Sequence, residues 1–261
     1  MVNLAKILLF GMLSVGPWSQ VWARDSVEVI GEKRGREQTE PTGALGWFKA
    51  GIKLAQTGEY PAALSRFERA RGMSPHWALP HLEIALVHLM TDNDRSAIAQ
   101  SLSKAVKFGA EMPRAHYLYG VFLQEEGQRK QATHHLVQAL KLRPSMVDAR
   151  YRLATLYVEQ GRQAEGIKQF EYVLSQRPSH MGAHRNLAML FEQSGQLELA
   201  EKHLKTISGL FPKNTYHLTG LGYFYRRVGW EKKAVKTFRR AERMDSRNKK
   251  KKMRPLLKSR R

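Results

Sequence analysis

Residues 147–180 read VDARYRLATLYVEQGRQAEGIKQFEYVLSQRPSH, and this stretch of 34 residues decides the fold. Apolar residues recur at spacings of three and four on both sides of Gly161, which is the pattern of two amphipathic helices. Glycine adopts a positive φ without steric cost, so Gly161 suits a tight turn between them. Ala154 and Gly166 are small residues at which the two helices can approach closely. The stretch therefore predicts a helix, a tight turn and a second helix.

The same pattern recurs along the chain with a period of 34 residues. Pro144, Pro178 and Pro212 follow this period. The small residues and the turn glycines follow it too, as Gly120, Ala154, Ala188 and Gly222, then Ala132, Gly166, Ala200 and Ala234, with Gly127, Gly161, Gly195 and Gly229 between them. A fixed period in this range is typical of repeat proteins, in which each unit buries its apolar face against its neighbours.

The chain resembles the tetratricopeptide-repeat (TPR) family, whose 34-residue unit carries Trp, Leu-Gly, Tyr, Ala, Phe, Ala and Pro at set positions. The first unit has Trp47, Gly51, Gly58, Tyr60, Ala63, Phe67, Ala70 and Pro75 in the family's order. The second unit is the weakest match, since Asp92, Asn93 and Asp94 stand at its turn. The resemblance covers about residues 44–246, in the manner of exported bacterial members. It implies an all-α fold, a right-handed α-solenoid of about six helix-turn-helix repeats.

Residues 1–23 have the features of a signal peptide. An apolar run follows Lys6 and ends before Gly16-Pro17, and a small-residue cleavage site ends at Ala23. The run is shorter than the roughly 18 to 20 apolar residues that a transmembrane helix needs. We therefore expect cleavage after Ala23 and export to the bacterial periplasm. The alternative is a membrane anchor formed by an uncleaved N-terminal segment.

The rest of the chain divides into three segments. Residues 24–43 are a flexible leader with glycine, proline and mixed charges. Residues 247–261 are a basic C-terminal tail, for which we expect disorder through self-repulsion, with extension of a final helix as the alternative. The solenoid lies between them at 44–246, with repeats near 44–77, 78–112, 113–146, 147–180, 181–214 and 215–246.

Composition excludes several kinds of chemistry. The chain has no cysteine, which rules out disulfides, cysteine-ligated zinc, thiol catalysis and lipid-modified cysteine. No phosphate-binding glycine loop and no Gly-x-Ser-x-Gly motif occurs, so we expect neither an enzyme nor a cofactor. Of the ten histidines, His180 and His184 have the spacing of helical metal ligands, but His180 falls in a predicted loop, and we expect no metal site.

The resemblance implies that the binding surface is lined by the first helix of each repeat. Arginine can bind a carboxylate or phosphate through two hydrogen bonds, and tyrosine offers a rigid apolar face with a polar tip. The alternative interpretation is that the tyrosines pack between repeats and the arginines are merely solvated. The family's positions give as candidate groove residues Arg114, Tyr117, Asp148, Tyr151, Arg152, Arg185, Asn186, Tyr216, Tyr223 and Arg226.

We expect a non-enzymatic scaffold or assembly adaptor of the cell envelope, which holds an extended segment of a partner protein in this groove and has no small-molecule substrate. The net charge of +21 also favours anionic partners. The alternative function is therefore a polyanion or membrane-surface binder for acidic polysaccharide, anionic lipid or nucleic acid. It would act through the sixth repeat and the tail residues Lys249, Lys250, Lys251, Lys252 and Arg254. Steep weakening by salt distinguishes this alternative from groove binding.

Overall fold

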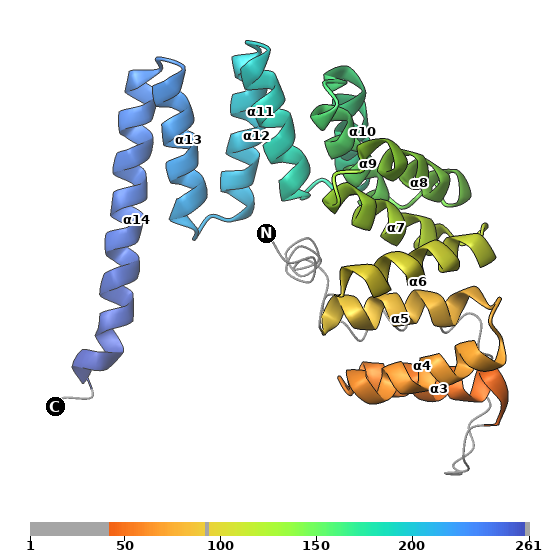
Figure 1. Ribbon diagram of the computed structural model, residues 1–261. Coiled ribbons are helices and arrows are strands. Elements are labelled where there is room, and N and C mark those ends of the chain that lie inside the picture. The colour runs from red at the N-terminus through yellow and green to blue at the C-terminus, as the bar shows by residue number, and fades with distance from the viewer. Residues whose placement is uncertain (1–41, 92–93, 259–261) are drawn as a thin grey trace. The chain divides into compact units, whose positions relative to one another are not determined.

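A computed structural model describes residues 42–91 and 94–258, with side chains described as far as Asp245. The predicted signal peptide, and residues 24–41 of the predicted leader, lie outside these residues. The regular structure in the described part is α-helical (Figure 1). The helices are α3 (Gly43–Gln56), α4 (Tyr60–Met73), α5 (Ala78–Met90), α6 (Arg95–Phe108), α7 (Pro113–Glu125), α8 (Arg129–Leu142), α9 (Val147–Glu159), α10 (Gln163–Gln176), α11 (Met181–Gln193), α12 (Leu197–Leu210), α13 (Thr215–Arg227) and α14 (Glu231–Lys258).

Successive helices pack in pairs, and each pair is a helical hairpin with a short turn. The pairs begin at α3, α5, α7, α9, α11 and α13, which confirms the all-α fold and the six helix-turn-helix repeats that the period predicted. Helices α3–α8 form one compact unit and α9–α14 form a second, with the division after Met146. None of the helices in the described ranges is both long and apolar enough to cross a bilayer.

Glycine makes the turn in five of the hairpins. Gly58, Gly127, Gly161, Gly195 and Gly229 have φ between 73° and 85°, a conformation that other residues adopt only with strain. The second hairpin has a different turn. Its helix α6 is capped by Asp94, whose carboxylate accepts hydrogen bonds of 3.0 Å from the backbone N–H groups of Ser96 and Ala97. An aspartate cap therefore maintains the hairpin where the family pattern is weakest.

Small residues allow the two helices of a hairpin to approach. A Cβ on Gly120 would lie 2.9 Å from the Leu136 side chain and 3.2 Å from the Ala132 carbonyl oxygen. A Cβ on Gly222 would lie 2.7 Å from the Phe238 ring. These distances are shorter than ordinary van der Waals contacts, so the facing side chain fills the space that a larger residue would need. The predicted close approach of Gly120 to Ala132 is thus confirmed.

The last helix is longer than the repeat requires. Helix α14 continues through Lys258, so residues 247–258 are helical. This is the helix extension that the sequence left open, and it replaces the disordered tail that we expected from charge repulsion. Lysine and arginine are good helix formers, which favours continuation of a helix that is already nucleated by packing against α13.

Candidate partner-binding site

A cleft between α11 and α13 lies on the first helices of the last two repeats, where the sequence predicted a binding surface. We call it the α11–α13 cleft. Its volume is about 490 Å³. Residues from α12, Leu204 and Ile207, lie at its base. The remaining lining residues are Arg185, Ala188, Met189 and Glu192 of α11 and Tyr216, His217, Thr219, Gly220, Tyr223 and Arg227 of α13.

Large apolar side chains are exposed in this cleft. Met189, Tyr216 and Tyr223 are 43%, 73% and 46% exposed. On α13, Tyr216, Tyr223 and Arg227 follow one another at spacings of seven and four, so they share one helix face. Nothing lies within 4 Å of a Cβ built on Gly220, so this glycine leaves open space between the tyrosines. The cleft is therefore an open surface on which two tyrosines and a methionine are exposed.

Charged groups flank the aromatic surface. Arg227 donates two hydrogen bonds of 2.9 Å to the Glu192 carboxylate, which links α13 to α11. This pairing raises the pKa of Arg227 above its ordinary value. Arg185 is an exposed cation two turns earlier on α11. The pKa of His217 is lowered, first by burial and then by the charge of Arg185. The Arg185 end of the cleft is accordingly positive, whereas the Glu192–Arg227 end is neutralised internally.

The structure brings three of the ten predicted groove residues into this cleft, namely Arg185, Tyr216 and Tyr223. Arg226 lies beside them, with its guanidinium carbon 5.0 Å from the centroid of the Tyr223 ring. Met189 stands at another of the family's groove positions, and it lines the cleft as that position implies. Arg227 was missed, and its signal was the four-residue spacing from Tyr223.

The other predicted residues of the second unit make contacts within the protein. Asp148 accepts a hydrogen bond of 2.7 Å from Arg177. Tyr151 accepts one of 3.2 Å from the Asn186 amide and lies against His180. Arg152 is half-buried on α9. The alternative interpretation, in which tyrosines pack between repeats, therefore describes Tyr151.

In the first unit, both predicted groove residues are largely internal. Tyr117 is buried. The side chain of Arg114 is 16% exposed, and its Nη1 lies 3.1 Å from Oε1 of Glu83, a carboxylate with no exposed surface. The tail residues Lys249, Lys250, Lys251, Lys252 and Arg254 belong to the C-terminal part of α14, beyond the residues whose side chains are described.

Four of the histidines form two pairs, each between the two helices of one hairpin. His116 Nδ1 lies 3.1 Å from His135 Nδ1, and His184 Nδ1 lies 2.8 Å from His203 Nδ1. The Nε2 atoms of His116 and His184 each face a backbone carbonyl oxygen and so donate to it. Each Nδ1 of these two residues is then an acceptor. No group of three or more metal-ligating side chains occurs within the described ranges, and His180 instead caps α11 by accepting from the Ala183 N–H.

These pairs predict a dependence of stability on pH. Burial lowers the pKa of His135 to about 4, and the neighbouring His116 and His134 lower it further. Burial lowers the pKa of His203 to about 4 as well, with smaller contributions from His184 and Lys202. Both imidazoles take up protons more readily in the unfolded chain, where their pKa has its ordinary value of 6.5. The stabilisation is therefore complete above about pH 6.5, and the free energy of unfolding should fall as the pH decreases to about 4.

Urea denaturation at several pH values measures this effect. His135→Gln with His203→Gln is the matched control, because an amide still donates to the partner imidazole but takes up no proton. The variant should show a weaker pH dependence than the unchanged protein between about pH 6.5 and 4. An identical dependence in both proteins would assign the effect to other groups.

The six consecutive helical hairpins define an α-helical repeat protein. Its α11–α13 cleft lies on the first helices of two adjacent repeats. Two family models described as tetratricopeptide repeat match the chain, one over residues 151–215 and one over residues 123–168. The matches show that residues 123–215 carry tetratricopeptide repeats, and the hairpins before and after them have the same helix-turn-helix form.

Solved structures with this fold are similar to the chain. PilF of Pseudomonas aeruginosa matches with a TM-score of 0.62 and 19% identity, over 77% of this chain and 91% of PilF. YrrB, described as a TPR protein with an unusual peptide-binding site, matches with a TM-score of 0.60 and 21% identity, over 68% of this chain and 91% of YrrB. MamA from Desulfovibrio magneticus RS-1 matches with a TM-score of 0.58 and 20% identity, over 65% of this chain and 95% of that one. The curated protein sequences include no significant match.

Proposed function

We propose that the chain is a non-enzymatic protein-interaction scaffold whose α11–α13 cleft binds an extended segment of a partner protein. The observation that carries this proposal is the exposure of Met189, Tyr216 and Tyr223 in one cleft. Soluble proteins seldom leave several large apolar side chains together in water unless they bind something there. Tyrosine and arginine are also the residue types that contribute most often to binding energy at protein interfaces.

The shape and charge of the cleft favour a peptide segment as the ligand. Two tyrosine rings separated by the open space at Gly220 offer room for apolar side chains of an extended chain. Arg185 supplies a planar cation for a carboxylate or a backbone carbonyl of the ligand. Peptide binding by YrrB, a protein of the same fold, supports this choice of ligand.

The cellular setting belongs to the same proposal. The signal-peptide features of residues 1–23 favour an adaptor that works in the bacterial cell envelope, and its partner is then an envelope protein. An intact-mass measurement of the protein purified from its own cells tests this part. A chain that begins after Ala23 supports it, and a cytosolic chain that begins at Met1 contradicts it.

Peptides selected from a displayed random library with the full chain test the cleft. Tyr216→Ala with Tyr223→Ala should weaken the selected peptides by about 100-fold or more, because each aromatic anchor typically contributes at least about 1.4 kcal/mol. The matched control is Tyr172→Ala, which removes an exposed tyrosine of α10 outside the cleft. Its affinity should equal that of the unchanged chain. Selected peptides that bind the double variant as tightly as the unchanged chain would contradict the proposal.

A further inference from the structure

A second cleft lies between α12 and α14, the second helices of the last two repeats. We call it the α12–α14 cleft, and its volume is about 550 Å³. It shares no lining residue with the α11–α13 cleft. Leu218, Leu221 and Tyr225 of α13 form its floor, at spacings of three and four that place them on one helix face. The two clefts therefore use different faces of α13.

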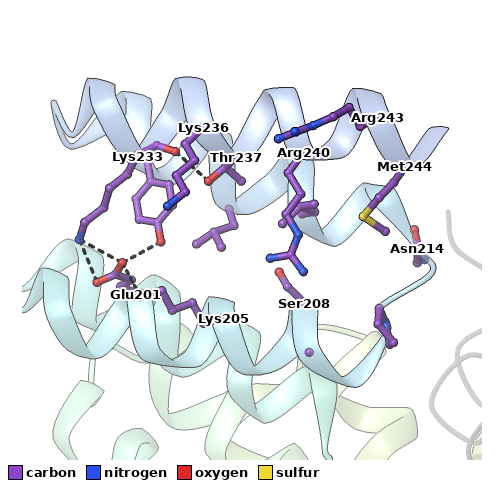
Figure 2. Close-up of a pocket in the computed structure, with 15 residues that line it drawn as sticks. Glu201, Lys205, Ser208, Asn214, Lys233, Lys236, Thr237, Arg240, Arg243 and Met244 are labelled. Atoms are coloured by element: carbon purple, nitrogen blue, oxygen red, sulfur yellow. Dashed lines mark hydrogen bonds and ion pairs between the residues drawn. The ribbon is translucent and has the colours of Figure 1, made fainter. Parts of the chain in front are cut away.

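The walls of this cleft are strongly basic. Lys233, Lys236, Arg240 and Arg243 line it from α14, at spacings of three and four that place them in one row. The row extends from Lys233 to Arg243, which is about 15 Å of helix. Figure 2 shows Lys236 and Arg240 on α14 directed toward α12, which carries Lys205 and Ser208.

One end of the row is already neutralised. Glu201 receives hydrogen bonds from Lys205 at 2.8 Å, from Lys233 at 3.1 Å and from the Tyr225 hydroxyl at 2.7 Å (Figure 2). Burial opposes ionisation of Glu201, but the hydrogen bonds from Lys205, Tyr225 and Lys233 outweigh it and hold the pKa of Glu201 at about 2. Glu201 is therefore a carboxylate at neutral pH, and it fixes Lys205 and Lys233.

The rest of the row has no such partner. In the part of the chain with described side chains, Lys236, Arg240 and Arg243 form no ion pair with a carboxylate. The acidic residues nearest to them in sequence, Glu242 and Asp245, line a separate cavity beside Tyr223. Lys236 and Arg240 thus face the cleft with no carboxylate partner, and Arg243 lies at its edge, where its Nε donates to the backbone carbonyl of Arg239 at 3.2 Å. This excess of positive charge fits an anionic ligand.

This basic row is peculiar to the last repeat and is not a requirement of the fold. One period earlier, the positions of Lys233, Lys236, Arg240 and Arg243 are occupied by Leu199, Lys202, Thr206 and Gly209. Two periods earlier they are Glu165, Lys168, Tyr172 and Ser175. The fifth repeat therefore folds with one cation at these four positions, and the fourth repeat folds with one cation and one carboxylate. Like charges at three- and four-residue spacing destabilise a helix, so the row is costly unless it binds something.

We propose that the α12–α14 cleft is a second binding site, which takes an acidic segment of a protein with interspersed apolar side chains. Carboxylates of the segment pair with Lys236, Arg240 and Arg243, and its apolar side chains cover the floor. The length of the row matches about five residues of extended chain.

The arrangement of the floor decides between a peptide and other anions. Leu218, Leu221 and Tyr225 lie in the cleft beneath the cations and are each less than 8% exposed. A bilayer surface needs apolar groups that protrude toward it, whereas a peptide segment can enter the cleft. Nucleic acid without base pairing binds on exposed aromatic rings, and Tyr225 offers only 3% of its surface. A flexible acidic segment is the ligand that reaches both the cations and the floor.

Fluorescence anisotropy with the full chain and a short labelled peptide of alternating glutamate and leucine tests the site. Lys236→Ala with Arg240→Ala should weaken this peptide by about tenfold or more, because charge-assisted contacts are lost. The matched control is Lys232→Ala with Arg239→Ala, which removes the same charge from α14 outside this cleft. The control should bind within about threefold of the unchanged chain. Equal weakening by both double variants would overturn the proposal.

Three further arms identify the ligand and separate this site from the α11–α13 cleft. A peptide with glycine in place of leucine should bind at least about tenfold more weakly, because it has no leucine side chains to bury in the cleft. If that peptide binds as tightly as the leucine peptide, the site recognises charge alone, and the proposal is overturned. Anionic phospholipid vesicles and single-stranded DNA are the second arm. If either binds more tightly than the acidic peptide and both double variants weaken it equally, the proposal is overturned as well. Tyr216→Ala with Tyr223→Ala should leave the acidic peptide unaffected, so failure of one site is distinguishable from failure of the other.

Discussion

Replacing Arg114 with alanine should lower the free energy of unfolding by about 3–5 kcal/mol. Glu83 has no exposed surface, and Arg114 Nη1 is its hydrogen-bond partner at 3.1 Å. Burial raises the pKa of Glu83, and the charge of Arg114 acts in the opposite direction. Without Arg114 the carboxyl group must remain charged in the interior or take up a proton, and both cost stability. Urea denaturation followed by circular dichroism at neutral pH measures the loss.

The control replaces both partners. Glu83→Leu with Arg114→Met removes the charges together and fills the space with apolar atoms, and such a change is often neutral or stabilising. It should recover most of the stability that Arg114→Ala loses. A loss below about 1 kcal/mol for the single variant, which is the range of surface ion pairs, would contradict the buried pairing of these two residues.

Replacing Phe170 with alanine should lower the free energy of unfolding by about 3–5 kcal/mol, because it removes a buried ring and leaves a cavity. Phe170 has no exposed surface and belongs to the core of the second unit. Its ring centroid lies 5.6 Å from that of Tyr151, which itself contacts Asn186 of the next repeat. The cavity therefore weakens contacts in two adjacent repeats.

Glu171→Ala is the matched control, since it changes the exposed neighbour of Phe170 on the same helix. Its effect should stay within about 0.5 kcal/mol. Hydrogen exchange gives a second measurement. In repeat proteins each unit contacts only its neighbours, so Phe170→Ala should reduce protection mainly in α9–α12. A uniform loss over α3–α8 as well would contradict this local coupling.

The sequence predicted the fold well because a period is a property of the whole chain. Proline, glycine and small residues in register mark most of the helix pairs. The weak second repeat folds as a hairpin as well, and Asp94 caps its helix α6. The position of a residue in this period predicts the helix face on which it lies. It does not predict the partner that the side chain finds.

The predicted binding residues show this difference. Arg114 and Tyr216 occupy equivalent faces in the period, yet Arg114 pairs with Glu83 whereas Tyr216 is 73% exposed. The partner of Arg114 lies in the preceding repeat, at a separation that no local pattern reveals. The sequence predicted a basic sixth repeat as an alternative binding surface, but it did not predict the α12–α14 cleft, because the family resemblance directs attention to first helices. Its signal was present in the sequence, in the row of cations that begins at Lys233 and is absent from the two preceding repeats.

Helix α13 connects the two proposed sites. It supplies Tyr216 and Tyr223 to one cleft and Leu218 and Leu221 to the other. A ligand that shifts this helix from one side therefore changes the affinity for the ligand on the other side. Thermodynamic reciprocity requires the two effects to be equal, so an acidic segment that tightens binding of the extended peptide by some factor is itself bound more tightly by the same factor. This helix of thirteen residues is the element through which any coupling between the two proposed sites would act.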